Sequence, residues 1–224
     1  MAAAANIVDL RRLLAERFPR AQVRRPVPAP PVHPTRLPAL DNLLGGGLAE
    51  GSITELVGKG NGSGSAQVLH AVLHAVAQSG RFTALVDGAD SFDVDAALPE
   101  VLARMLWVRC AGAGEALKAA DLLLRDRNLP LVILDLKPVR TRELQRVPSN
   151  LWFRFSRLVE HHGTTLLVIT PHALVGAADV RVRVDGGMDL ERVAAGPEAV
   201  AAGLRFELLR QETGVFEGTL AGTA

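Results

Sequence analysis

Short apolar segments alternate with segments of helical periodicity along most of this 224-residue chain. The apolar segments predict strands at residues 53–57, 82–87, 131–135, 165–170 and 180–184. Between them, apolar side chains recur at the spacing of a helix in residues 65–78, 94–102, 115–125 and 151–161. Near-continuous apolar strands separated by helices predict an α/β fold, with a mostly parallel sheet that is buried on both faces and flanked by helices.

Near its end the chain changes to alternating apolar and polar positions. Residues 181–184, 204–210 and 215–220 follow this period of two, which is typical of strands with one exposed face. We therefore expect antiparallel strands at one edge of the sheet, formed by the last part of the core.

A separate segment precedes the core. Residues 6–18 carry apolar side chains at helical spacing, and six prolines between Pro26 and Pro38 predict an extended linker after them. A helix this short is not stable alone in water, so we expect residues 1–36 to dock on a partner or on another protomer and residues 37–224 to form the core. The candidate partner-binding residues are Leu10, Leu13, Leu14, Phe18, Arg24 and Arg25.

The net charge of +1 conceals two basic segments. Seven arginines lie between Arg11 and Arg36, and six basic residues lie between Lys137 and Arg157. Such a local excess suits a polyanion or an acidic protein surface, and it also suits an ordinary solvated face. The candidate DNA-binding residues are Lys137, Arg140, Arg142 and Arg146.

The sequence indicates a cytoplasmic protein, with association to the nucleoid as an extension of that prediction. It shows no cleavable signal and no apolar run of about 18 residues, so we expect no membrane contact. The lone cysteine, Cys110, is expected to be a small buried side chain in a reducing compartment.

Residues 58–65, GKGNGSGS, have the frame of a phosphate-binding P-loop between a predicted strand and a predicted helix. A working loop reads G-x-x-x-x-G-K-[ST], in which backbone N–H groups and the lysine hold phosphates and the hydroxyl holds Mg²⁺. Here Ser63 replaces the second glycine and Gly64 replaces the lysine, whereas Ser65 keeps the hydroxyl. Asp135, at the end of a later strand, is placed like the aspartate that organises Mg²⁺ in P-loop folds.

The loop is therefore interpreted as a vestigial nucleotide site. Two features leave weak binding of ATP and Mg²⁺ open: Lys59 can reach toward a phosphate, and a glycine-rich loop at a helix N-terminus can hold an anion through its backbone. We expect no cofactor and no metal otherwise. The vestigial site comprises Gly58, Lys59, Ser63, Gly64, Ser65 and Asp135.

The segment LPALDNLLGGGLAEGSITELVG, residues 37–58, resembles the entry into RecA-family cores. The resemblance continues through FTALVDGADSFDV, LPLVILDL and TTLLVITPHAL, so it spans most of residues 37–185. The short chain and the missing lysine further resemble ImuA-type RecA-like proteins. The residues that match the entry motif are Leu40, Asp41, Gly45, Gly46, Gly47, Gly51, Glu55 and Gly58.

The resemblance implies that catalytic groups have been lost. Gly64 stands at the lysine position, Ala89 at the position of the general-base glutamate, and His172 at the position of the glutamine that senses the γ-phosphate. The DNA-binding loop that follows in RecA is reduced here to residues 174–178. Each positioned group contributes on the order of 10²–10³ to a rate, so we expect no catalytic residues and no enzyme activity beyond a residual ATPase.

The resemblance also implies partners. ImuA-type proteins act in the bacterial SOS response to DNA damage, where they accompany an inactive Y-family polymerase homologue, the ImuB-type protein, in mutagenic translesion synthesis. We therefore expect an adaptor that binds RecA, this polymerase homologue or a second copy of itself. Two alternatives stay open: a divergent RecA-like DNA-dependent ATPase that uses Lys59, and direct DNA binding without ATP through the second basic segment.

Two other motifs could indicate a different function, a dinucleotide-binding loop and a histidine pair. The spacing Gly58-x-x-x-Gly62-x-Gly64, with Asp87 at the end of the next strand, matches short-chain dehydrogenases, but those enzymes need a catalytic tyrosine and this chain has none. His70 and His74 are four residues apart on one predicted helix without a third ligand nearby, so packing is expected there and not a metal site.

Overall fold

The computed structural model describes residues 30–186, 191, 194 and 196–211. Its central feature is a seven-stranded sheet with the strand order β5-β4-β6-β7-β3-β8-β9. All neighbouring pairs are parallel except β8 and β9, which are antiparallel. The strands are β3 (Ile53–Gly58), β4 (Thr83–Asp87), β5 (Met105–Arg109), β6 (Leu131–Asp135), β7 (Thr165–Thr170), β8 (Val180–Asp185) and β9 (Arg205–Gln211).

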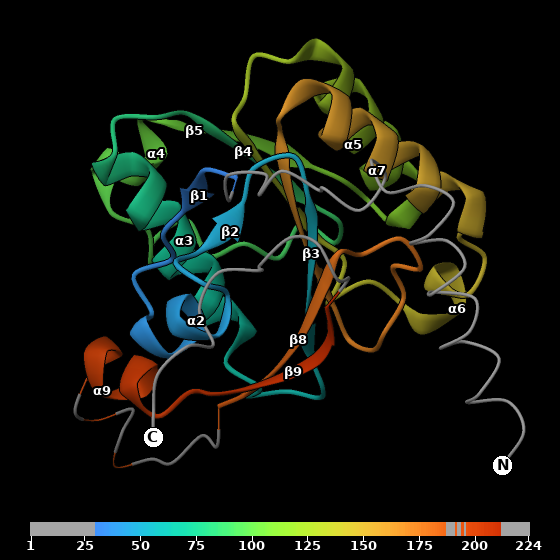
Figure 1. Cartoon of the computed structure of the whole chain (residues 1–224). Coiled ribbons are helices and arrows are strands. Elements are labelled where there is room, and N and C mark those ends of the chain that lie inside the picture. Colours follow the sequence, from blue (N-terminus) through green and yellow to red (C-terminus); the bar gives the residue numbers. More distant parts are fainter. Residues whose placement is uncertain (1–29, 187–190, 192–193, 195, 212–224) are drawn as a thin grey trace, which may run out of the picture.

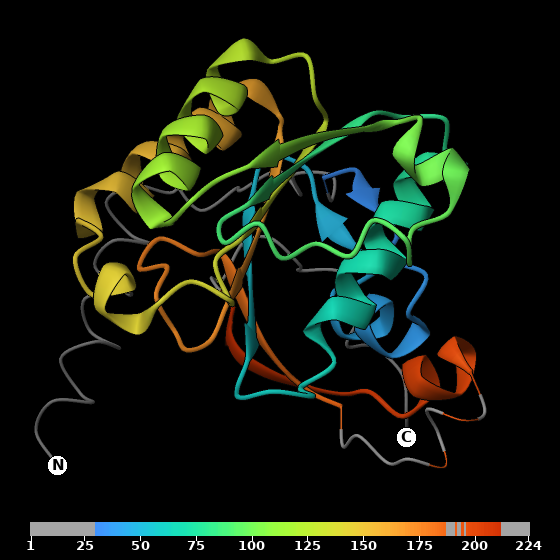
Figure 2. The same ribbon diagram turned by 180° about the vertical axis from the view of Figure 1, so that it is seen from behind.

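Helices cover both faces of this sheet, as Figure 1 shows and the reverse view in Figure 2 repeats. One face carries α2 (Pro38–Leu43), α3 (Ser65–Gln78), α4 (Pro99–Leu102) and α9 (Pro197–Ala202). The other carries α5 (Ala113–Asp126), α6 (Thr141–Leu144) and α7 (Ser149–His162). A separate antiparallel pair, β1 (Val32–His33) and β2 (Leu48–Ala49), precedes the strands of the main sheet in the sequence.

The alternation of side chains along each strand produces two hydrophobic cores. In β6, Ile133 faces the core built with α3, whereas Val132 and Leu134 face the core built with α5 and α7. Each of these three side chains is fully buried. This explains why the strands are apolar at nearly every position: a strand covered on both faces exposes neither set of side chains to water.

The parallel register brings the carboxyl ends of the strands to one edge of the sheet. Asp87 at the end of β4 pairs in register with Asp135 at the end of β6. Val57, next to the end of β3, pairs with Thr170 at the end of β7. In open α/β sheets, ligand sites lie at this edge, and the P-loop frame lies here too.

The prediction of an α/β fold with antiparallel edge strands is confirmed. The predicted helix at residues 94–102 is wrong over most of its length, because α4 begins only at Pro99. Proline has no N–H to donate and disfavours helical conformation in the residue before it, so it suits the first helical position. The edge strand β5 was not predicted. The predicted N-terminal helix and the predicted strand at residues 215–220 lie outside the described residues.

Among the described residues, no helix is long and apolar enough to cross a membrane.

Candidate functional site

The P-loop frame connects β3 to α3, and the position of its missing lysine has no room for a side chain. Gly64 has a φ of +85°, a left-handed conformation that side-chain-bearing residues rarely adopt. A Cβ atom placed on it would lie 2.2 Å from Cδ2 of Leu204. Leu204 is itself buried, between α9 and β9. The chain after α9 therefore occupies the space that a lysine at position 64 would enter.

A second segment packs against the backbone of the same loop. Gly186 directly follows β8, and a Cβ atom on it would lie 2.9 Å from the carbonyl oxygen of Gly62 and 3.0 Å from the amide nitrogen of Gly64. Only glycine permits such a close approach of two backbones. The backbone of residues 62–64 is thus in close contact with the chain that follows β8.

A lysine from the turn after β6 reaches into the loop. The Nζ atom of Lys137 donates hydrogen bonds to the Oγ atoms of Ser63 at 2.7 Å and of Ser65 at 2.8 Å. Both serines are buried. In a working P-loop the hydroxyl at the position of Ser65 is a ligand of Mg²⁺. The ammonium group of Lys137 therefore supplies the positive charge on the side of the loop where a metal ion would sit.

Lys137 and Asp135 form a compact charged group at the end of β6. Burial, with a smaller contribution from the charge of Asp87, raises the pKa of Asp135 to about 6, against the lowering effects of the Lys137 backbone N–H and ammonium group. The Oδ1 atom of Asp135 accepts that backbone N–H at 3.0 Å. Burial lowers the pKa of the Lys137 ammonium, and the carboxylate of Asp135 partly offsets this. The opposite charges of Asp135 and Lys137 thus stabilise one another at a partly buried site.

The carboxylate of Asp87 organises a loop and is not available for a ribose. It is buried and accepts the backbone N–H groups of Ser91 and Phe92, both at 2.8 Å, and of Ala89 at 3.3 Å. The indole of Trp107 lies at 3.4 Å from the same carboxylate. The acidic group that a dehydrogenase would use for its cofactor is fully engaged within the protein, which removes the support for that alternative.

The segment after β7, where RecA carries a DNA-binding loop, is fixed by Glu55. This fully buried carboxylate accepts the N–H groups of Leu174 at 2.7 Å and of Val175 at 3.1 Å, and it pairs with Arg181 at 2.5 Å. Arg181 also donates to the carbonyl oxygen of Val175 at 2.8 Å. His172 is exposed at the start of this segment.

A small depression borders the loop on its exposed side. It has a volume of about 320 Å³ and is lined by Lys59, Arg183, Val184 and Asp185. Lys59 is exposed and makes no ion pair among the described residues. Arg183 is held by Glu207 on β9 at 2.5 Å. Of the predicted nucleotide-binding residues, Lys59 is therefore the one that points to solvent, while Ser63 and Ser65 bind Lys137.

The predicted DNA-binding cluster is divided in the structure. Lys137 points into the P-loop, away from the arginines with which the sequence grouped it. Arg140, Arg142 and Arg146 are exposed and form no ion pair within the described part of the chain. Nearby on α7, Trp152 and Phe155 are buried whereas 58% of Phe153 is exposed.

Of the two histidines predicted to pack, His70 has an aromatic neighbour and His74 has a carboxylate neighbour. His70 stacks on Phe92 with ring centroids 5.3 Å apart, and His74 lies 3.8 Å from the carboxylate of Glu100. Within the described ranges, no group of three or more His, Cys, Asp and Glu side chains could hold a metal ion.

The sheet order, the glycine loop between β3 and α3 and the aspartate at the end of β6 define a RecA-like P-loop core. The chain is similar to the RadB recombinase, whose crystal structure superposes with a TM-score of 0.56 over 70% of this chain and 85% of that chain. The two sequences are 20% identical, so the likeness establishes the fold. No protein-family model and no curated protein sequence matches the chain.

Sequence reasoning missed the role of Lys137, although a signal for it exists. A lysine two residues after the aspartate of β6 lies at the same edge of the sheet as the P-loop, in a chain where Gly64 has replaced the lysine of that loop. Leu204 and Gly186 carry no such signal, because their contacts depend on how α9 and β9 return to the core.

Proposed function

We propose that this protein is a non-catalytic RecA-like adaptor in the bacterial response to DNA damage. It links RecA to an inactive Y-family polymerase homologue of the ImuB type in mutagenic translesion synthesis. One observation carries the loss of catalysis: the ammonium group of Lys137 donates hydrogen bonds to both serines of a P-loop in which Gly64 stands at the lysine position. The link to these partners comes from the resemblance of the sequence to ImuA-type proteins.

The fixed segment after β7 supports a role that does not depend on nucleotide. A RecA-like motor needs groups that move when a phosphate is bound or released. Here Glu55 holds the N–H groups of Leu174 and Val175 and is itself paired with Arg181. A segment held through backbone bonds and a buried ion pair serves as a rigid docking surface.

The competing function is a DNA-dependent ATPase, and the depression beside the loop favours it. Lys59 is exposed there, so one cation is available to a phosphate at the depression, beside an Arg183 that is paired with Glu207. In this alternative the γ-phosphate contacts Lys59, and Lys59→Met abolishes binding of Mg-ATP.

Calorimetric titration of Mg-ATP separates the two functions, with RecA as the positive control. If the adaptor proposal is right, neither the wild type nor Lys59→Met gives heat with Mg-ATP. Micromolar binding by the wild type that disappears in Lys59→Met establishes the ATPase instead and refutes the adaptor as a nucleotide-free protein.

Assembly is tested by light scattering during gel filtration, with RecA and the polymerase homologue added singly and together. The adaptor forms a ternary complex without added nucleotide. The double variant Leu10→Ala/Leu14→Ala, on the predicted apolar side of the N-terminal segment, loses one partner, whereas Arg12→Ala/Glu16→Ala on the polar side retains both. Absence of any complex with either partner refutes the proposal.

A further inference from the structure

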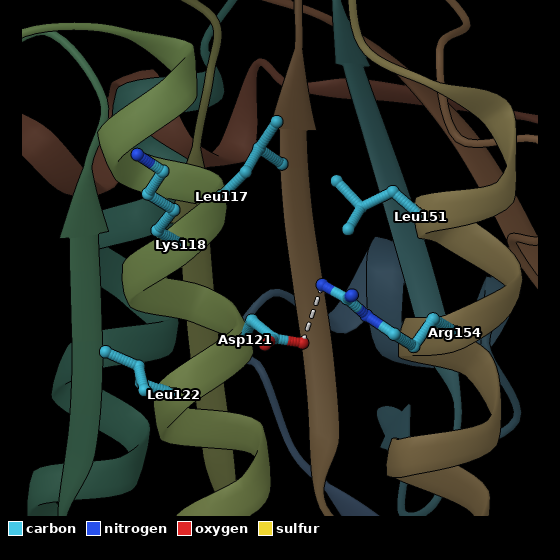
Figure 3. Close-up of a pocket in the computed structure, with 6 residues that line it drawn as sticks. All are labelled: Leu117, Lys118, Asp121, Leu122, Leu151 and Arg154. Atoms are coloured by element: carbon cyan, nitrogen blue, oxygen red, sulfur yellow. Dashed lines mark ion pairs between the residues drawn. The ribbon is translucent and has the colours of Figure 1, made fainter.

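A groove runs between α5 and α7 on the face of the sheet opposite to α3 (Figure 3). Its volume is about 440 Å³. Leu117 and Leu151 point toward one another across it, and Asp121 and Arg154 meet between the two helices. The lining residues are Leu117, Lys118, Asp121, Leu122, Leu151 and Arg154.

The groove has an apolar floor and an apolar rim. Leu117 on the floor is buried and Leu151 is half-buried, whereas 69% of Leu122 is exposed. Leu122 is the most exposed of the large hydrophobic side chains among the described residues. It stands one turn after Lys118 on the same side of α5, so the rim presents a leucine and an ammonium group together.

The charges of the groove do not cancel. Asp121 is paired with Arg125 at 3.1 Å and with Arg154 at 2.9 Å, so its single negative charge already faces two guanidinium groups. Lys118 forms no ion pair within the described part of the chain. Among the lining residues, the two cations Lys118 and Arg154 stand against the one carboxylate of Asp121, and Arg125 adds a positive charge beside them. The groove is therefore positive around an apolar floor, which is complementary to an acidic partner.

The ion pair between Arg154 and Asp121 leaves part of the guanidinium accessible. The Oδ1 atom of Asp121 is buried and lies 2.9 Å from Nη2 of Arg154, without the alignment of a hydrogen bond. Half of the Arg154 side chain is exposed to solvent. An incoming carboxylate at the rim can therefore share Arg154 with Asp121, whose Oδ2 atom is also paired with Arg125.

We propose that the α5–α7 groove binds an amphipathic helix of a protein partner, with leucine-sized side chains on its buried face and carboxylates along its edges. The inference rests on the proposed adaptor function and assigns a surface to it. Two adjacent helices form a trough that accepts the apolar stripe of a third helix. Lys118 and Arg154 at the rim then pair with acidic residues on the flanks of that stripe.

The test uses the full-length protein and a fluorescein-labelled synthetic helical peptide with leucines on one face, glutamates along the flanks and alanines elsewhere. A matched peptide carries lysine in place of every glutamate. Fluorescence anisotropy should show that the glutamate peptide binds at least about tenfold more tightly than the lysine peptide. Leu122→Ser should weaken it about tenfold, because the exposed part of this leucine becomes buried on binding. Lys118→Glu should weaken it about fivefold.

Matched control variants lie elsewhere on the molecule. Leu98→Ser removes another exposed leucine, before α4, and Lys59→Glu makes the same charge change beside the P-loop. Both should bind the glutamate peptide like the wild type. Equal affinity for the two peptides, or unchanged affinity in Leu122→Ser and Lys118→Glu, overturns the proposal. A competition experiment gives a further test. If a single-stranded oligonucleotide displaces the peptide and itself binds more weakly to Leu122→Ser and Lys118→Glu, the groove is a polyanion site and the proposal is overturned.

The groove proposal and the adaptor proposal can be refuted independently of one another. If RecA and the polymerase homologue assemble on the wild type and equally on Leu122→Ser and Lys118→Glu, the groove is not their docking site and the adaptor function stands. If neither partner binds but the glutamate peptide binds with the expected losses, the groove is real and the adaptor function is wrong.

Discussion

Replacing Lys137 with methionine is the most direct test of the filled P-loop. Methionine retains most of the aliphatic stem and removes the ammonium group, so the hydrogen bonds to Ser63 and Ser65 are lost. A hydrogen bond to a charged group contributes about 1.5–3 kcal/mol. The two bonds share one ammonium group, whose own burial opposes them, so their contributions do not add. We expect the free energy of unfolding to fall by about 2 kcal/mol.

Urea unfolding followed by tryptophan fluorescence measures this loss, since Trp152 on α7 is buried and reports on the core. For a domain of this size the loss corresponds to a decrease in Tm of about 4–8 °C. Lys59→Met is the matched control: the same chemical change at an exposed lysine of the same loop should alter stability by less than about 0.5 kcal/mol.

A second measurement separates a cation site from ordinary packing. In Lys137→Met the space beside Ser65 and Asp135 is open to a metal ion, so millimolar Mg²⁺ should raise the Tm of this variant and leave that of the wild type unchanged. Equal stability losses in Lys137→Met and Lys59→Met, with no response to Mg²⁺ in either, refute the reasoning that the ammonium group replaces a bound cation.

Three further predictions concern the groups around the loop. Because burial raises the pKa of Asp135 from its ordinary value of 3.8 to about 6, the folded protein holds a proton that the unfolded chain has released, so this group's contribution to stability falls as the pH rises through this window. Urea unfolding at about pH 4.5 and about pH 7 should show a smaller pH dependence in Asp135→Asn than in the wild type. Gly64→Lys should lower the Tm, through left-handed strain of about 1–2 kcal/mol and overlap with Leu204, and calorimetry should show no gain of Mg-ATP binding; full stability with ATP binding contradicts this. Glu55→Gln should cost about 3–5 kcal/mol, because it leaves Arg181 half-buried without its carboxylate, and a loss below about 1 kcal/mol in urea unfolding contradicts that role.

The sequence was most informative where local pattern and tertiary environment agree. The helix predicted at residues 65–78 has these bounds in the structure, because Val68, Leu69, Val72 and Leu73 repeat at helical spacing and all of them are buried. The strands at residues 131–135 and 165–170 were predicted to the residue for a related reason. Their uninterrupted apolar runs have no stable place except the interior of a parallel sheet.

Strand β5 could not be predicted in the same way. Residues 105–109 read MLWVR, and their side chains are partly buried or exposed because the strand lies at the edge of the sheet and is covered incompletely. Neither a continuous apolar run nor a clean alternation results. Its pairing with β4, from Thr83↔Met105 to Asp87↔Arg109, is a property of the assembled sheet.

The sequence predicted where the candidate site lies, but not which side chains fill it. The loop, its lost lysine and Asp135 follow from a motif with fixed spacing. The occupation of that loop depends on Lys137, 74 residues from Ser63 in sequence, and on Leu204, which returns after α9. A contact between segments so far apart is set by the topology of the fold, so the lysine after Asp135 gains its meaning only once the strands are placed in one parallel sheet.

The hydrogen bonds from Lys137 to Ser63 and Ser65 change which ligands the loop can respond to. A metal ion or a nucleotide binds a P-loop with a dissociation constant, so the state of the loop follows the concentration of that ligand in the cell. An ammonium group that is covalently part of the chain has no dissociation constant and cannot be diluted, chelated or depleted. The positive charge beside Ser63 and Ser65 is therefore present whatever the concentration of Mg²⁺ in the cell.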